Sequence, residues 1–310
     1  MRRIAPLIAG IALVCGIAAY PRHLVSRTAT SPDFVHFESA HVHPACLTPA
    51  GNRLLVVNTP DNRLTVFDIG AGPPGNGNRL AEIPVGVEPV SVAALSDSEA
   101  WVVNTLSDDI SVVNLNTFHV RATLRVGDEP GDVVFAGSPL KAYVSVSQLD
   151  EVLAIDPVSL ATVATIPVGA RMPRALARTA DGSMVYVAMM QANNRTAIMS
   201  TTRVPDDSIP QDLAFPKDTL NGPAPKTGLI VQQQPDGWYD MYGNLWSSKI
   251  KFTMTDVAVA EINTATNAVS RGFGGLTRLG TENYSIAVSP VDGLIAVANT
   301  RARNQFRFQP

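Results

Sequence analysis

The chain has 310 residues, of which 45% are hydrophobic and 16% charged, and its formal net charge is −3 at pH 7. This composition excludes an intrinsically disordered chain and offers no basic surface for nucleic acid. The length allows one large β domain or two ordinary domains. The 23 prolines and 22 glycines suit many short strands joined by turns.

The chain begins with two arginines and an uncharged apolar run over residues 4–20. The run is intermediate in length between the apolar region of a signal peptide and a minimal membrane span. We therefore predict a signal peptide or N-terminal anchor over residues 1–20 and a linker over residues 21–36. Cleavage would give a periplasmic or secreted protein, whereas an uncleaved segment would tether it to the inner membrane.

The central feature is an internal repeat whose Val-Gly boundary recurs at Val85, Val126 and Val168. The glycines of these boundaries lie 41 and 42 residues apart. Each boundary is followed by apolar strands and turns, and four strands in about 40–45 residues is the period of a propeller blade. The sequence thus predicts an all-β fold, a β-propeller of four-stranded blades over residues 37–310.

About five repeats are recognisable in this predicted propeller. They lie near residues 37–86, 87–127, 128–169, 170–280 and 281–310, the last being partial. The next comparable boundary contains Gly280, 111 residues after Gly169, and this gap is too long for one blade. We therefore place an insertion within the fourth repeat, over residues 201–255.

The repeat motifs resemble those of the YVTN-type β-propeller family. That family combines a Ser-Pro-Asp-Gly-like turn, a Val-Tyr-Val-x-Asn strand and a Val-Gly-x-x-Pro boundary. Here the turn is seen at 179–182 and 289–293, and the strand at 100–104 and 185–188. The resemblance implies a seven-bladed fold, relative to which this chain is incomplete. A third strand of the last repeat is predicted at 304–308, so we expect either a fragment or closure by self-association.

Channel-facing positions supply one candidate binding site. By alignment of the repeats, residues near the start of the innermost strands face the central channel: His41, His43, Glu88, Glu129 and Arg174. Such residues could bind a ligand or a cation, although the favoured interpretation is that they are polar groups lining a wet channel. Because no second histidine pair is available, no metal site and no cofactor are predicted.

The insertion supplies a second candidate site, because it contains six prolines and an aromatic cluster. The aromatic residues are Trp238, Tyr239, Tyr242 and Trp246. Long loops of this kind are commonly functional, and exposed aromatic residues often anchor protein interfaces. The alternative is that these side chains pack the insertion onto the propeller.

The sequence contains no pattern that assigns a catalytic residue. There is no Gly-x-Ser-x-Gly motif, no phosphate-binding glycine loop and no Cys-x-x-Cys-His. The acidic pairs at 108–109 and 150–151 recur at the same turn of two repeats, which indicates turn chemistry rather than acid–base catalysis. Cys46 lies within a predicted innermost strand, where it is expected to fill the core.

These observations favour an exported, non-catalytic propeller that serves as a binding or scaffold module in the cell envelope. Its partner would be a protein or another envelope component, and not nucleic acid. One alternative is the propeller part of a periplasmic c-type-haem electron-transfer protein. Another is a lactonase-like hydrolase using His43, Glu88, Glu129 and Arg174.

Overall fold

The computed structural model describes residues 39–70, 78–203, 228–240, 242–253, 255–270 and 279–300. All of them belong to one of two units of the chain, Glu38–Pro310. The predicted signal peptide or anchor, its linker and the strand at 304–308 lie outside the described residues. Within the described part, no helix is long and apolar enough to span a membrane.

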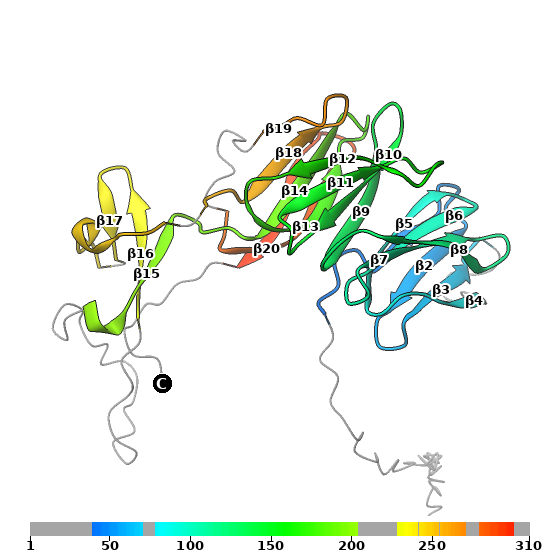
Figure 1. Cartoon of the computed structure of the whole chain (residues 1–310), viewed down its shortest axis with the longest axis horizontal. Coiled ribbons are helices and arrows are strands. Elements are labelled where there is room, and N and C mark those ends of the chain that lie inside the picture. The colour runs from blue at the N-terminus through cyan, green and yellow to red at the C-terminus, as the bar shows by residue number, and fades with distance from the viewer. Residues whose placement is uncertain are drawn as a thin grey trace, which may run out of the picture. The chain divides into compact units, whose positions relative to one another are not determined.

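Four antiparallel four-stranded sheets confirm the predicted blades (Figure 1). Blade 1 comprises β1 (Ala45–Leu47), β2 (Arg53–Asn58), β3 (Arg63–Asp68) and β4 (Asn78–Pro84). Blade 2 comprises β5 (Pro89–Ser96), β6 (Glu99–Asn104), β7 (Asp109–Asn114) and β8 (His119–Arg125). Blade 3 comprises β9 (Pro130–Ala136), β10 (Lys141–Val146), β11 (Glu151–Ile155) and β12 (Thr162–Pro167).

Blade 4 is interrupted in sequence but continuous in its hydrogen bonding. It comprises β13 (Arg171–Arg178), β14 (Met184–Gln191), β18 (Val259–Asn263) and β19 (Val269–Ser270), in that order. β14 pairs directly with β18, so the chain leaves the blade after β14 and returns to the next position. The two outer strands of this blade, β18 and β19, therefore follow the insertion in sequence. A two-stranded sheet of β20 (Glu282–Val288) and β21 (Ile295–Thr300) follows.

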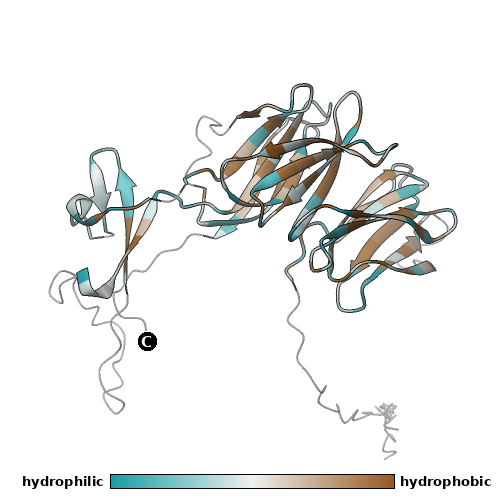
Figure 2. Ribbon diagram, viewed as in Figure 1, coloured by the Kyte–Doolittle hydropathy of each residue, from teal (hydrophilic) through white to brown (hydrophobic). Residues whose placement is uncertain are grey.

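The core lies between neighbouring blades, because each internal sheet buries both of its faces. One buried cluster joins blades 1 and 2 through side chains such as Leu64 and Val102. Another joins blades 3 and 4 through Tyr143 and Val187. The alternating β-branched residues of the inner strands supply this apolar surface, as the hydrophobic colouring of the blades shows (Figure 2).

Successive blades are also connected at their boundaries by a repeated backbone contact. Glu88, Glu129 and Met172 each adopt a left-handed backbone with φ of 54°. Their N–H groups donate to a side-chain oxygen in the turn between the second and third strands of the preceding blade. The acceptors are Asn62 Oδ1 at 2.8 Å, Asp108 Oδ1 at 3.2 Å and Asp150 Oδ1 at 2.9 Å. The acidic pairs therefore serve turn chemistry, as predicted.

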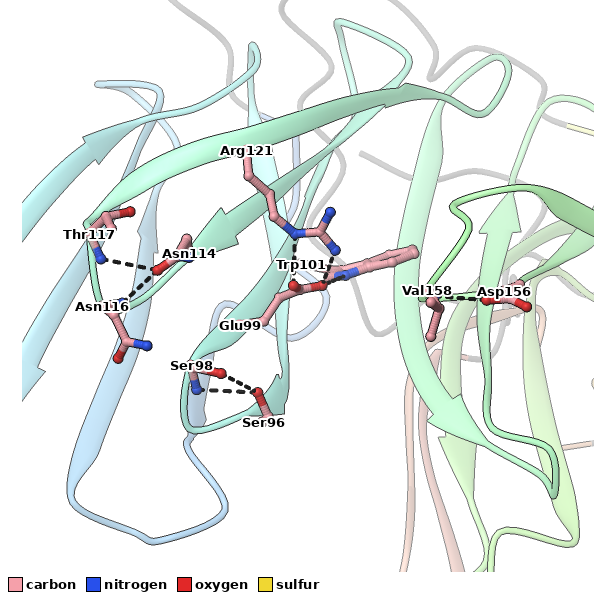
Figure 3. Close-up of polar contacts among 10 residues, drawn as sticks. All are labelled: Ser96, Ser98, Glu99, Trp101, Asn114, Asn116, Thr117, Arg121, Asp156 and Val158. Carbon is pink, nitrogen blue, oxygen red and sulfur yellow. Dashed lines mark hydrogen bonds and ion pairs between the residues drawn. The ribbon is translucent and has the colours of Figure 1, made fainter.

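In blades 2 and 3, short polar side chains at the ends of strands accept hydrogen bonds from the backbone of the turn that follows (Figure 3). Asn114 Oδ1 accepts hydrogen bonds from the backbone N–H groups of Asn116 and Thr117 at 2.9 and 3.0 Å. On the same blade, Arg121 forms a two-point ion pair with Glu99, both contacts being 2.8 Å long. These local contacts fix the turns without covalent cross-links.

The insertion between β14 and β18 is a small sheet rather than the predicted loop. It contains β15 (Thr196–Met199), β16 (Leu229–Gln234) and β17 (Gly237–Tyr239), hydrogen-bonded in that order. Short 3-10 turns, η1 (Thr201–Arg203) and η2 (Ser247–Lys249), accompany it. Because β15 pairs with β16, the departure from the blade begins before the predicted residue 201.

Candidate functional site

The candidate channel site is organised by residues 39–43, which precede β1 and which we call the leading segment. Its backbone runs parallel to the innermost strand of blade 2. Val42 donates its N–H to Val90 O at 3.0 Å, and His43 O accepts from Val92 N at 2.9 Å. This pairing places the side chains of the leading segment against the innermost strands of several blades.

Asp132, in the innermost strand of blade 3, is the centre of this polar cluster. Its side chain is completely buried. One carboxylate oxygen accepts from His43 Nδ1 at 2.7 Å and from the Leu176 backbone N–H at 2.8 Å. The other accepts from Ser91 Oγ at 2.5 Å. Asp132 thus joins the leading segment to blades 2, 3 and 4, and its hydrogen bonds offset the cost of burying a carboxylate.

Asp132 was not among the predicted site residues, although the repeat contains a signal for it. Asp132 and Ser91 each stand two residues after the boundary proline, at the start of an innermost strand. Blade 4 has Ala175 at this position. A polar residue recurring in an otherwise apolar strand needs a buried hydrogen-bond partner, and that requirement could have pointed to this position.

His43 is electrostatically coupled to Asp132. The hydrogen bond that His43 donates to Asp132 is the main cause that raises the pKa of His43, and the aspartate's negative charge adds to it, while burial acts in the opposite direction. Because Nδ1 donates to the carboxylate, the ring has a fixed orientation. A carboxylate that fixes the ring of a histidine is the arrangement used to orient a general base. The same hydrogen bond also connects the leading segment to β9.

Glu88 and Arg174 contact the same leading segment. Glu88 is buried, and Ser39 donates to its Oε2 through both its N–H, at 3.3 Å, and its hydroxyl, at 2.5 Å. Arg174 donates through Nη2 to the Ala40 carbonyl oxygen. Burial lowers the pKa of Arg174, an effect that the charges of Glu129 and Asp132 oppose.

The other two predicted channel residues differ from each other. His41 Nε2 lies 2.5 Å from Thr59 Oγ1, and that hydroxyl donates to Pro89 O at 2.7 Å, so the histidine is the donor in the first contact. Glu129 instead accepts from Gln148 Nε2 at 2.8 Å. Four of the five predicted channel residues are therefore joined by the leading segment, and Glu129 is not part of these contacts.

The described residues contain no group of three or more His, Cys, Asp or Glu side chains placed to hold a metal ion. Three of the candidate channel residues, His43, Glu88 and Glu129, each contact a separate partner: Asp132, Ser39 and Gln148. Cys46 is half-buried in β1, and burial raises the pKa of its thiol to about 11. A thiol with so high a pKa is a weak nucleophile at neutral pH.

The aromatic cluster of the insertion forms a core rather than an exposed surface. Trp238 and Trp246 are only 8% and 7% exposed and pack with Met199, Leu229 and Val231. Trp246 Nε1 also donates to Asp240 Oδ2 at 2.9 Å. The interpretation of both tryptophans as exposed anchors is therefore wrong; they are buried, as the alternative expected, but they pack within the insertion.

The two tyrosines of the cluster retain more contact with solvent. Tyr239 is half-buried, and its hydroxyl donates to Asp236 Oδ2 at 3.0 Å. Tyr242 is 38% exposed and Leu245, beside it, is more exposed still. An interaction surface on this part of the insertion would rest on these side chains.

The successive four-stranded antiparallel sheets define a β-propeller, and comparison with known proteins defines its family. Residues 18–204 match the family model described as "Lactonase, 7-bladed beta-propeller". This match spans more than half of the chain, so the chain belongs to that family. No curated protein matches the sequence.

Among solved structures, the chain is similar to Kuenenia stuttgartiensis hydrazine synthase. The two are 19% identical, with 86% of this chain and 76% of the other covered, and the TM-score is 0.48.

Proposed function

We propose that this protein is an exported, non-catalytic β-propeller that acts as a binding module in the cell envelope. One observation carries the proposal: the leading segment occupies the polar groups of the channel. Ser39 bonds to Glu88, Ala40 to Arg174 and His43 to Asp132. Groups that hold the chain's own backbone and side chains in this way are committed to structure.

A substrate in the channel would have to replace these contacts. The Asp132 carboxylate accepts hydrogen bonds from two side chains and from the backbone, and breaking them would leave a buried charge unpaired. A catalytic base needs a position from which it reaches the substrate directly or through one water. The channel therefore favours a scaffold, and the insertion provides the more open surface for a partner.

Cross-linking in intact cells tests the binding-module proposal. An amine-reactive cross-linker should join Lys249 or Lys251 of the insertion to one reproducible envelope protein, because both lysines are exposed. Trp246→Ala, which removes the core of the insertion, should abolish this product, whereas Leu140→Ala, at an exposed leucine beside β10 of blade 3, should retain it. Recovery of the chain without any cross-linked partner in either case would contradict the proposal.

A second candidate function is hydrolysis of a lactone, favoured by the orientation of His43 on a buried carboxylate and by the family. In this case His43 would act as a general base toward water, with Asp132 holding its ring. The reaction requires the leading segment to move. A lactone panel assayed by pH-stat tests it: turnover lost in His43→Gln but kept in His119→Gln, a change at an exposed histidine, would establish this function. The haem-linked alternative stays a prediction.

A further inference from the structure

A groove on the insertion combines exposed apolar side chains with positive charge. Its lining includes Ile198, Ile230, Phe252, Arg203, Lys249 and Lys251. We call this set the basic groove. Residues of β20 and β21, among them Glu282 and Thr300, also line it.

The apolar part of the basic groove lies on the sheet face opposite the tryptophan core. Ile198 and Ile230 are direct partners in the register of β15 and β16. Since successive side chains of a strand point to opposite faces, Ala197 and Met199 pack with the core while Ile198 points away from it. Ile198 is 78% exposed and Phe252 is 75% exposed. Isolated exposed apolar residues are common, but two such residues lining one groove indicate a contact surface.

The cationic part of the basic groove has little internal compensation. Arg203, Lys249 and Lys251 are exposed and form no ion pair with any residue that the structure describes. The carboxylate that lines the groove, Glu282, accepts from Tyr284 Oη at 2.5 Å. In a chain of net charge −3, three cations gathered on one groove favour a negatively charged occupant.

We propose that the basic groove binds an extended, acidic segment of a partner protein in which carboxylates alternate with apolar side chains. This inference rests on the proposed function as a binding module. The lining places cations such as Lys251 beside exposed apolar residues such as Phe252 in the same groove, so an occupant would present both carboxylates and apolar side chains. Within the described residues β15 pairs only with β16, which makes it the edge strand of its sheet. An extended segment suits such an edge, because main-chain hydrogen bonds supply affinity and alternate side chains supply specificity.

A short labelled peptide tests this assignment. The probe is fluorescein-labelled Glu-Val-Glu-Val-Glu-Val with an amidated C-terminus, and the comparison probe replaces each glutamate by lysine. Fluorescence anisotropy with the full chain should show binding of the glutamate probe and none of the lysine probe. The affinity should fall as salt is raised, because the charges are exposed to solvent.

Two variants locate the binding. Lys249→Gln/Lys251→Gln should lower the affinity for the glutamate probe by about tenfold, because the double variant removes two exposed ion pairs that each contribute part of this loss. Ile198→Asn should weaken it through the apolar contact. Arg79→Gln/Arg125→Gln is the matched control, because it changes net charge equally on exposed strands of blades 1 and 2. The tryptophan fluorescence of each variant reports whether the insertion core is retained.

The possible outcomes separate this inference from the function on which it rests. Equal binding of both probes, or equal weakening by the control variant, overturns the assignment to the basic groove. Absence of probe binding while the cellular cross-link persists also overturns it and leaves the binding-module function standing. Absence of both the probe complex and the cross-link contradicts the two proposals together.

Discussion

The blades and the insertion are both antiparallel sheets, yet they use their side chains differently. Internal blades bury both faces, and the polar residues of their inner strands are paired across blades through Asp132, which accepts from Ser91 and Leu176. The insertion buries one face around Trp238 and Trp246 and presents Ile198 and its cations on the other. One region is thus built for mutual support between sheets, and the other leaves a face open for a partner.

This contrast explains why a group of polar residues at equivalent repeat positions is a poor guide to function in a repeat fold. The channel residues looked reactive in the sequence, but the leading segment satisfies most of them. The insertion looked like an irregular loop, but it has its own core. Function in this protein is therefore expected where packing is incomplete, not where polar residues converge.

The sharpest way to break the comparison is to remove the buried carboxylate of blade 3. Asp132→Asn should destabilise the chain by about 3–5 kcal/mol, because it disrupts a buried charged network and places a donor among donors. Urea unfolding measures this loss. Asp61→Asn, at an exposed aspartate, is the control and should change stability little. An equal effect of the two substitutions would show that the Asp132 network does not hold the blades together.

The next largest effect is expected in the insertion. Trp246→Ala should destabilise its small core by about 3 kcal/mol, near the lower end for loss of a large aromatic residue, and should leave the blades folded. Hydrogen exchange measured peptide by peptide would show loss of protection in β15–β17 alone. Leu245→Ala is the matched control at an exposed neighbour. Simultaneous loss of protection in blades 3 and 4 would refute the independence of the two regions.

A smaller effect is expected where blades 3 and 4 meet. The Tyr143 hydroxyl donates to Asn267 Oδ1 at 2.9 Å, and burial raises the pKa of Tyr143 to about 12. Tyr143→Phe should cost about 1 kcal/mol in urea unfolding, the usual net value of one such hydrogen bond. Tyr239→Phe, in the insertion, should leave the unfolding of the blades unchanged. If Tyr143→Phe left the free energy of unfolding unchanged, apolar packing alone would connect these blades.

The smallest effect concerns pH. Because folding raises the pKa of His43, the stabilisation from its protonated form is complete below the unfolded value of about 6.5 and is lost as pH rises through the folded pKa. The difference in Tm between the wild type and His43→Gln should therefore narrow from pH 5.5 to pH 9. A difference that widens with pH would reverse the assigned direction of the shift.

Much of the fold was predictable because the repeat combines period, turn residues and strand patterns that all agree. The Val-Gly boundaries placed the four blades correctly, and the recurrence of acidic pairs identified their turn role. The Asp132 network was not predictable in the same way, since His43 and Asp132 lie 89 residues apart and meet only after three blades pack.

The insertion was harder to predict for a local reason. Its proline content suggested a loop, whereas β15 and β16 are short strands separated by a long stretch of sequence. The aromatic residues correctly indicated an apolar contact, but they did not show that the tryptophans pack against the strands of the insertion itself. The pairing of β15 with β16 determines which side chains are exposed, and no local sequence pattern predicts that pairing.

Hydrogen–deuterium exchange of the leading segment tests the central claim most directly. The account predicts that peptides covering residues 39–43 are protected to the same degree as the innermost strand β5, because the Val42 N–H donates to Val90 O and the Val92 N–H donates to His43 O. Exchange of residues 39–43 as fast as that of an unstructured chain would contradict it. The channel groups would then be free, and the catalytic alternative would take precedence over the binding module.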